Sequence, residues 1–269
     1  MSLSVPDRTE SNPTQRKHKV FYGWWIVVAA SIQGMFGNGT ISSGFPIFFQ
    51  PIRETLGINY AQMSLVFGLA RAEGGMGGPI VGWLVDRYGS RRFVILGGFL
   101  AAIGLILLSR ATTYWQLMFL FVGVVSIGKT AGLGQTLMAT VNQWFIRRRA
   151  LAMSTLMTAF AGGGAIVVPL LGIGIANLGW RQTLLYAGLF VGVISFGISL
   201  VIRSKPEDIG LLPDGDLPQD SLGEVSAGQG DKPSQVQRAE FTVRQALRTK
   251  TFWLMLIGVV TRVSATNAI

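Results

Sequence analysis

The sequence has no cysteine and a single histidine, His18, which lies in a polar N-terminal stretch. The lack of cysteine excludes disulfides, thiolate zinc sites, iron–sulfur clusters and cysteine nucleophiles. One histidine is too few for a histidine-rich metal site, and its place in the tail argues against a Ser-His-Asp triad. Charged residues make up only 13% of the chain, against about 25% in ordinary soluble domains. We therefore expect no metal, no cofactor and no enzyme, and the composition argues against a soluble globular fold.

Six apolar stretches approach or exceed the roughly 20 residues that a helix needs to cross the hydrocarbon of a bilayer. They cover residues 21–49, 61–84, 93–108, 115–143, 150–178 and 183–202. A polar stretch rich in Pro, Gly, Asp and Ser follows, and a seventh apolar stretch begins at Thr251. We predict an all-α membrane protein with a cytoplasmic tail over 1–20, a six-helix transmembrane bundle over 21–203, a cytoplasmic linker over 204–249 and the start of a seventh transmembrane helix over 250–269.

The basic residues indicate how these spans are oriented. The net charge of +10 would suit nucleic-acid binding, but 17 Lys and Arg residues fall in the tail and in alternate loops, and only three fall on the opposite side. Cytoplasmic loops carry such an excess, and tryptophans gather at the two membrane interfaces. All seven tryptophans lie near a predicted span end. We therefore expect a multi-pass plasma-membrane protein in a lipid bilayer, with the N-terminus and linker inside and no nucleic-acid partner.

Residues 123–130 read GVVSIGKT and match the P-loop pattern. A P-loop needs backbone N–H groups free to bind phosphate and a soluble sheet behind it. Here the match lies near the middle of the fourth apolar stretch, where irregular backbone is tolerated only under protein or water. A nucleotidase is therefore the weakest reading of this chain.

Residues 82–92 read GWLVDRYGSRR, between the second and third predicted spans on the cytoplasmic side. This segment resembles the signature between helices two and three of the major facilitator superfamily. Further segments resemble the branch of monocarboxylate porters and oxalate–formate antiporters: WFIRRRALA at 144–152, GGG at 162–164 with Pro169, GWR at 179–181 and KPEDIGLLPDG at 205–215.

The resemblance implies a twelve-helix fold of two six-helix halves, with substrate bound between them. This chain would hold the N-terminal six-helix bundle, the linker and a truncated seventh helix, so that its missing C-terminal half is an expected partner. The complete carrier would be monomeric. The resemblance also implies a gating latch at the cytoplasmic rim, formed by Asp86, Arg87, Arg91 and Arg92. A plain positive-inside loop is the alternative for the arginines.

Three basic residues lie deep inside the predicted spans. With a rise of 1.5 Å per residue, Arg71 lies roughly 16 Å, Lys129 roughly 21 Å and Arg262 roughly 18 Å from a span end. Intramembrane charges are costly and are functional candidates by default. The only acidic residue at that depth is Glu73, so one pairing leaves two cations uncompensated. A bound organic anion would neutralise them.

Helix phase groups further candidates for substrate binding or coupling. At 100° per residue, Lys129, Thr136 and Thr140 lie on one stripe of the fourth span, and Gln33 lies on a second plausible cavity wall. Arg71 and Glu73 are 200° apart by the same geometry, so one of them would bind a neighbouring helix. For each candidate, interhelical pairing or hydrogen bonding is the alternative to contact with substrate.

We therefore predict a secondary active transporter of small organic anions such as carboxylates, working by alternating access with proton symport or anion exchange. One alternative is a facilitator for neutral or cationic compounds such as drugs or sugars. The other is a non-transporting half-carrier that acts as an assembly or regulatory partner in the membrane.

Overall fold

The computed structural model describes residues 21–203, together with Thr249, Trp253 and Gly258. The chain divides into two compact units, residues 1–221 and 222–269. In the second unit Trp253 and Gly258 are helical. The predicted tail, nearly all of the linker and the rest of the predicted seventh helix lie outside the described residues. Every regular element within 21–203 is a helix, which confirms the predicted all-α fold.

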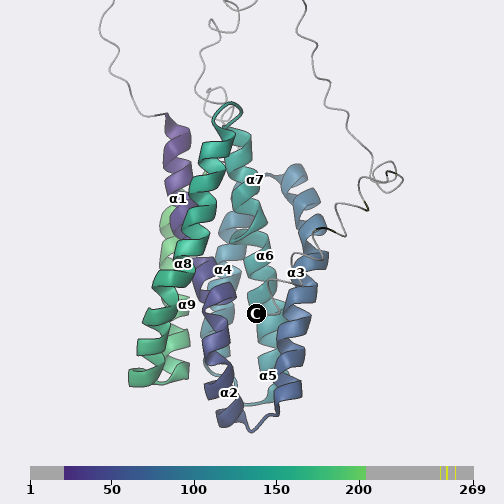
Figure 1. Cartoon of the computed structure of the whole chain (residues 1–269), viewed down its shortest axis with the longest axis vertical. Helices are drawn as coiled ribbons and strands as arrows, with labels where there is room; N and C mark the ends of the chain where they lie inside the picture. The colour runs from purple at the N-terminus through teal and green to yellow at the C-terminus, as the bar shows by residue number, and fades with distance from the viewer. Residues whose placement is uncertain (1–20, 204–248, 250–252, 254–257, 259–269) are drawn as a thin grey trace, which may run out of the picture. The chain divides into compact units, whose positions relative to one another are not determined.

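The helices of this bundle run up and down along one direction (Figure 1). In chain order they are α1 Tyr22–Asn38, η1 Gly39–Ser43, η2 Phe45–Phe48, α2 Phe49–Leu56, α3 Tyr60–Tyr88, α4 Ser90–Leu108, α5 Tyr114–Met118, η3 Phe119–Ser126, α6 Ile127–Gly132, α7 Gln135–Trp144, α8 Arg149–Leu178 and α9 Trp180–Val201. The η1 and η3 segments are π-helical, and η2 is a 3-10 turn. The first pass therefore combines α1 to α2, and the fourth combines α5 to α7.

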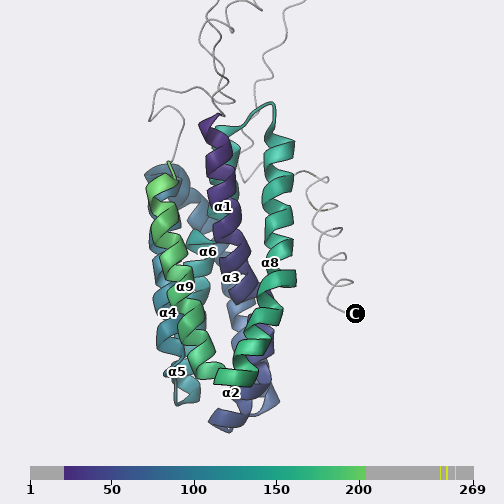
Figure 2. The same ribbon diagram turned by 90° about the vertical axis from the view of Figure 1, so that its left-hand side faces the viewer.

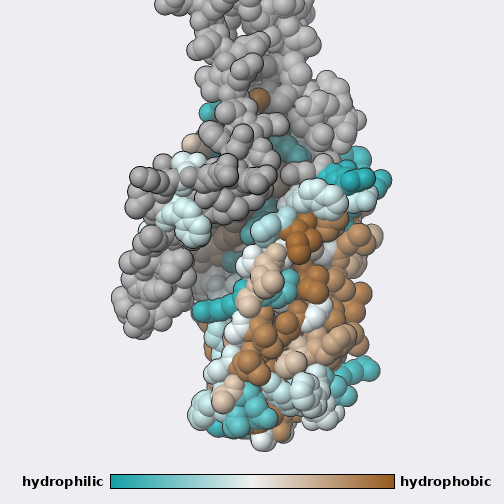
Figure 3. Space-filling view, turned by 90° about the vertical axis from the view of Figure 1, so that its right-hand side faces the viewer, coloured by the Kyte–Doolittle hydropathy of each residue, from teal (hydrophilic) through white to brown (hydrophobic). Residues whose placement is uncertain are grey.

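Four helical passes are long and apolar enough to cross a membrane by length and composition: Ser90–Leu108, Tyr114–Trp144, Arg149–Leu178 and Trp180–Val201. The first pass is divided by η1, and α3 carries several charged side chains. Large apolar residues of α4 and α9, including Leu96, Val193 and Leu200, are about two-thirds exposed. On the face that includes α3, apolar side chains gather between hydrophilic ends (Figure 3). Such an exposed apolar surface suits contact with lipid.

Two arrangements hold the bundle together. Helix α1 lies between α8 and α9, as Figure 2 shows, and α4 packs against both α9 and α6. Near the end of the bundle that holds α2, the rings of Phe45 and Phe121 stack with centroids 3.9 Å apart. At the opposite end Trp144 and Phe145 pack against the start of α1. These contacts fix the first and fourth passes, which carry most of the candidate site.

Helix α3 begins with a capping box. The Asn59 side chain accepts a hydrogen bond from the Gln62 backbone N–H at 2.7 Å, and the Gln62 side chain accepts one from the Asn59 backbone N–H at 3.0 Å. Two of the otherwise unpaired N–H groups at the helix start are thereby satisfied. The cap therefore fixes the start of the helix that carries Arg71 and Glu73.

Asn59→Ala is expected to lower the free energy of unfolding by about 1 kcal/mol, because it removes the capping acceptor. The measurement is the thermal unfolding midpoint of the purified protein in detergent. Asn59→Asp keeps an acceptor at the same place and should remain near wild type. Equal midpoints for the alanine variant and wild type would contradict a stabilising role for this cap.

Candidate functional site

A cavity of about 390 Å³ opens between the broken part of the first pass, α3 and the fourth pass. Its charged lining residues are Arg71 and Lys129. Its remaining lining residues are mostly apolar or hydroxyl-bearing: Ile41, Ser42, Pro46, Phe67, Ala70, Gly74, Phe121, Ser126, Thr130, Gly134 and Gln135. The lining thus combines a mainly apolar wall with two cations, a composition that suits a small amphipathic anion.

The two cations come from facing helices. Arg71 projects from the middle of α3 and is exposed, whereas Lys129 projects from α6 and is half-buried. Lys129 interacts electrostatically with both Glu73 and Arg71. Arg53 and Glu54 form an ion pair at 3.9 Å near the α2 end of the bundle, and neither Arg71 nor Lys129 forms one with a described carboxylate. The structure therefore brings Arg71 and Lys129 to one cavity without a carboxylate in direct contact with either.

The Glu73 carboxylate forms hydrogen bonds with the fourth pass. Its Oε2 accepts hydrogen bonds from the hydroxyl of Ser126 and, at 3.4 Å, from that of Thr130. A Cβ added at Gly77 would lie 2.9 Å from Glu73 Oε1, so the glycine leaves room for the carboxylate to lie along its own helix. Helix phase predicted that Arg71 and Glu73 could not both face the cavity, and the structure gives these two residues different neighbours.

Breaks in two passes shape the cavity. The π-helical η1 and the following 3-10 turn bring Ser42 and Pro46 to the lining. In the fourth pass α6 ends at Gly132 and α7 starts at Gln135, so the pass changes course between them. The Gln135 amide lies over Gly78 of α3, where an added Cβ would meet it at 2.8 Å. Discontinuous helices of this kind surround the substrate sites of several transporter folds.

Three other predicted site residues lie elsewhere. The Thr136 hydroxyl donates to the Ala131 carbonyl at 2.6 Å, and the Thr140 hydroxyl donates to the Thr136 carbonyl at 2.8 Å. Gln33 is buried, and its Nε2 donates to the Val94 carbonyl of α4 at 3.5 Å. None of the three lines the cavity that holds Arg71 and Lys129.

The predicted gating residues lie at the end of α3 and the start of α4. The guanidinium of Arg87 lies 5.6 Å from the ring centre of Trp83, and Arg91 donates to the Ser199 carbonyl of α9 at 3.4 Å. Arg92 is exposed. The side chain of Asp86 and the whole of Arg262 lie outside what the structure describes, so the latch stays a prediction.

Sequence reasoning missed Ser126, Thr130 and Gln135 as lining residues. The first two lie within the P-loop look-alike, residues 123–130, which is helical through η3 and α6. The signal was present in this segment: two hydroxyl residues next to Lys129, inside an otherwise apolar stretch. The pattern thus marked a polar stretch of the fourth pass, although a loop that holds phosphate does not form there.

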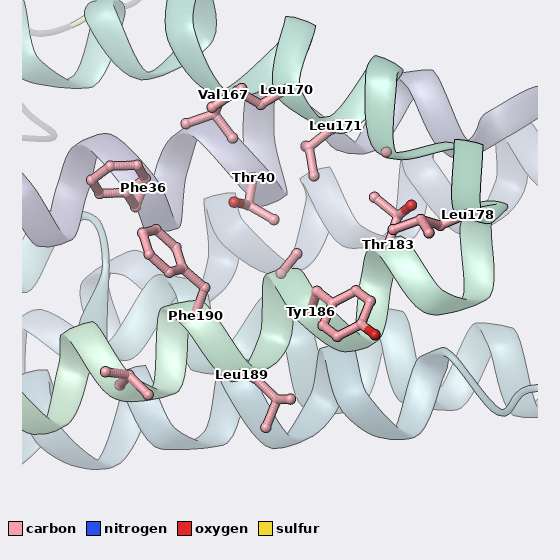
Figure 4. Close-up of a pocket in the computed structure, with 13 residues that line it drawn as sticks. Phe36, Thr40, Val167, Leu170, Leu171, Leu178, Thr183, Tyr186, Leu189 and Phe190 are labelled. Atoms are coloured by element: carbon pink, nitrogen blue, oxygen red, sulfur yellow. The ribbon is translucent and has the colours of Figure 1, made fainter. Parts of the chain in front are cut away.

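A second, larger pocket of about 510 Å³ lies between α1, α8 and α9. Figure 4 shows Phe36, Leu171 and Phe190 around it, and its hydroxyl-bearing residues are Thr40, Thr183 and Tyr186. The pocket has no charged lining residue, so its greater size does not make it the better site for an ion. An anion would lose its hydration there without gaining a counter-charge.

Residues 20–269 match the family model of the Major Facilitator Superfamily. The chain is 32% identical over 172 residues to Monocarboxylate transporter 2 of Mus musculus, which covers 62% of this chain and 34% of that protein. It is 30% identical over 193 residues to Monocarboxylate transporter 13 of Rattus norvegicus, and this match covers 70% of this chain and 44% of that protein. The fold is similar to the crystal structure of a bacterial homologue of the human lysosomal transporter Spinster in an inward-facing, unoccupied conformation. The TM-score is 0.56 and the sequence identity 21%, and the match covers 76% of this chain and 48% of that chain.

The chain thus spans less than half the length of these curated relatives. Their names agree with the branch that the sequence motifs resemble, and the likeness to the Spinster homologue concerns the fold alone. The family match covers nearly the whole chain, including the GWLVDRYGSRR segment at 82–92. The chain therefore belongs to the major facilitator superfamily and is an integral, multi-pass membrane protein.

Proposed function

We propose that the natural protein is a secondary active transporter of small organic anions, carboxylates in particular. It would work by alternating access, driven by proton symport or anion exchange. The six-helix bundle would pair with a second half, and substrate would bind between the halves near the middle of the membrane. The N-terminus and the linker would lie in the cytoplasm, with the protein in the plasma membrane.

One observation supports this proposal above all others. Arg71 and Lys129 line the same cavity, while the nearby carboxylate of Glu73 is hydrogen-bonded to Ser126 and Thr130. Two cations in a low-dielectric setting repel each other and are costly to hold without a counter-ion. A carboxylate entering the cavity would lower that cost and could accept charge-assisted hydrogen bonds from both cations. The relatives named as monocarboxylate transporters support the same class of substrate.

The test is counterflow in liposomes that contain the purified protein, with a panel of labelled mono- and dicarboxylates. Once one label exchanges, unlabelled propionate and propionamide are compared as competitors, because they share size and shape but differ in charge. We expect propionate to compete at a concentration at least about tenfold lower, since hydrogen bonds to a charged group contribute about 1.5–3 kcal/mol. Equal competition by the amide, or exchange of neutral or cationic compounds only, would instead favour a facilitator for such compounds.

A further inference from the structure

We propose that Glu73 binds the transported proton and that the Ser126 hydroxyl switches its hydrogen bond between the two protonation states of this carboxyl group. The inference rests on the proposed function and decides between its two driving forces in favour of proton symport. It is based on the contacts of Ser126 with two different acceptors on α3 and on the charges around the cavity.

Ser126 Oγ lies within hydrogen-bond distance of two acceptors. One is Glu73 Oε2, and the other is the Ala70 backbone carbonyl at 3.1 Å. A hydroxyl group has one hydrogen to donate and lone pairs with which to accept. Ser126 can therefore donate to only one of these acceptors at a time, and the protonation state of Glu73 determines which.

When Glu73 is ionised, the Ser126 hydroxyl donates to Oε2, and the Thr130 hydroxyl at 3.4 Å provides a second donor. When a proton binds at Oε2, Glu73 donates that proton to Ser126 Oγ. The Ser126 hydroxyl then rotates to donate to the Ala70 carbonyl, which has a second lone pair available beside its helical hydrogen bond. Neither state leaves the half-buried carboxyl group or the buried hydroxyl without a partner, so a proton can bind and leave without the penalty of an unpaired polar group.

The charges around Glu73 connect this proton to the anion. Among the described residues on the helices that pack against α3, α6 contributes Lys129, and η3 and α7 contribute no charged residue. The charged residues of α4 are Arg91 and Arg92 at its first turn, and those of α2 are Arg53 and Glu54 near the opposite end of α3. On α3 itself the cation nearest in sequence is Arg71. Lys129 and Arg71 are therefore the charges that a proton on Glu73 affects most.

Protonation of Glu73 removes a negative charge from the neighbourhood of both cations. The cavity then attracts an anion more strongly, because Glu73 no longer offsets part of the charge of Lys129. Linkage requires the reverse effect to be equal: a bound anion strengthens the binding of the proton. Mutual strengthening of proton and anion binding favours the state in which both are bound, which is the state that a symporter carries across, whereas simple anion exchange needs no titrating group at this place.

The experiment uses two assays on the same liposomes. In the first, an inward proton gradient drives accumulation of a labelled carboxylate, and in the second the carboxylate exchanges by counterflow without a gradient. We expect Glu73→Gln to lose gradient-driven accumulation and its pH dependence, while counterflow stays within about threefold of wild type, since the cations remain. Glu54→Gln is the matched control, because it neutralises an exposed carboxylate outside the cavity, and it should accumulate like wild type.

Ser126→Ala provides a second variant that keeps the carboxylate. We expect the pH midpoint of uptake by this variant to differ from that of the wild type by about half a pH unit or more, because one hydrogen bond has an effect of this size. An unchanged pH midpoint of uptake in Ser126→Ala would overturn the hydroxyl switch. This test does not depend on whether the Glu73→Gln protein folds. Normal gradient-driven accumulation by a Glu73→Gln protein would overturn Glu73 as the proton site.

Wild-type protein gives the remaining outcomes. Counterflow of carboxylates without any response to a proton gradient would overturn this inference but leave the proposed anion carrier in place. Absence of both counterflow and accumulation would instead count against the proposed function itself.

Discussion

Lys129→Ala is expected to abolish carboxylate uptake while the protein still inserts into the membrane. Lys129 is the half-buried cation of the cavity, and the variant leaves a bound carboxylate with Arg71 alone. Truncating one partner of a desolvated, hydrogen-bonded charge pair costs about 2–5 kcal/mol, which corresponds to at least a roughly 30-fold loss of affinity. The measurements are the initial rate of uptake into liposomes and the carboxylate Kd from isothermal titration calorimetry.

Arg110→Ala is the matched control, because it removes an exposed cation just after the C-terminal end of α4 that does not line this cavity. It should keep the wild-type Kd and rate. Lys129→Arg retains the charge in a different shape and is expected to fall between wild type and the alanine variant. Uptake by Lys129→Ala within twofold of wild type, with an unchanged Kd, would eliminate Lys129 from the anion site.

The positions of the helices could be predicted from the sequence because hydrophobic length is a local property. The apolar stretches 93–108 and 150–178 coincide with α4 and α8 almost residue for residue. Polar boundaries such as the GWLVDRYGSRR segment interrupt the apolar run and mark the ends of α3 and the start of α4. The position of a transmembrane helix depends on the hydrophobicity of its own segment and on the surrounding lipid and water. It can therefore be predicted without knowing how the helices pack.

The candidate site could be predicted only in part. Depth along a span identified Arg71 and Lys129, because the rise per residue is nearly constant whatever the neighbours are. The stripe that joined Lys129 to Thr136 and Thr140 assumed one straight helix. The fourth pass instead contains a π-helical segment and a break between α6 and α7, which invalidates a constant 100° per residue across it. A local deviation of this kind depends on tertiary contacts and has no simple sequence signal.

The glycine contacts show the same limit. The spacing of Gly74, Gly78 and Gly82 is typical of close helix packing. A Cβ added at Gly82 would nevertheless meet no atom within 4 Å, one at Gly74 would meet a single side-chain oxygen at 3.9 Å, and one at Gly78 would meet only the Gln135 side chain. The closest approach of two helix backbones that involves the fourth pass is instead between α4 and α6. A Cβ added at Gly97 would lie 2.4 Å from the Gly132 backbone nitrogen. Sequence spacing identifies a smooth helix face but not the neighbour that uses it.

Gly132→Leu is therefore expected to prevent formation of a stable bundle. A Cβ at this position would lie 2.5 Å from the Gly98 backbone nitrogen of α4, and backbone cannot rotate aside as a flexible side chain can. The helices would have to separate by roughly an ångström for ordinary van der Waals contact. Overpacking typically costs 1–3 kcal/mol and occasionally more, and we expect about 3 kcal/mol or more here. The measurement is the monodisperse fraction on size-exclusion chromatography in detergent, with the thermal midpoint of any folded material.

Gly197→Leu is the matched control, since Gly197 lies on α9 and a Cβ there would meet nothing within 4 Å. Both variants replace a helical glycine by the same helix-favouring residue, so a difference between them isolates the α4–α6 contact. That contact also determines the site, because Gly132 lies about one helical turn beyond Lys129 on α6. A partly folded Gly132→Ala protein should therefore bind carboxylate more weakly than its loss of stability alone explains. Normal folding and binding by Gly132→Leu would mean that the α4–α6 contact does not position Lys129.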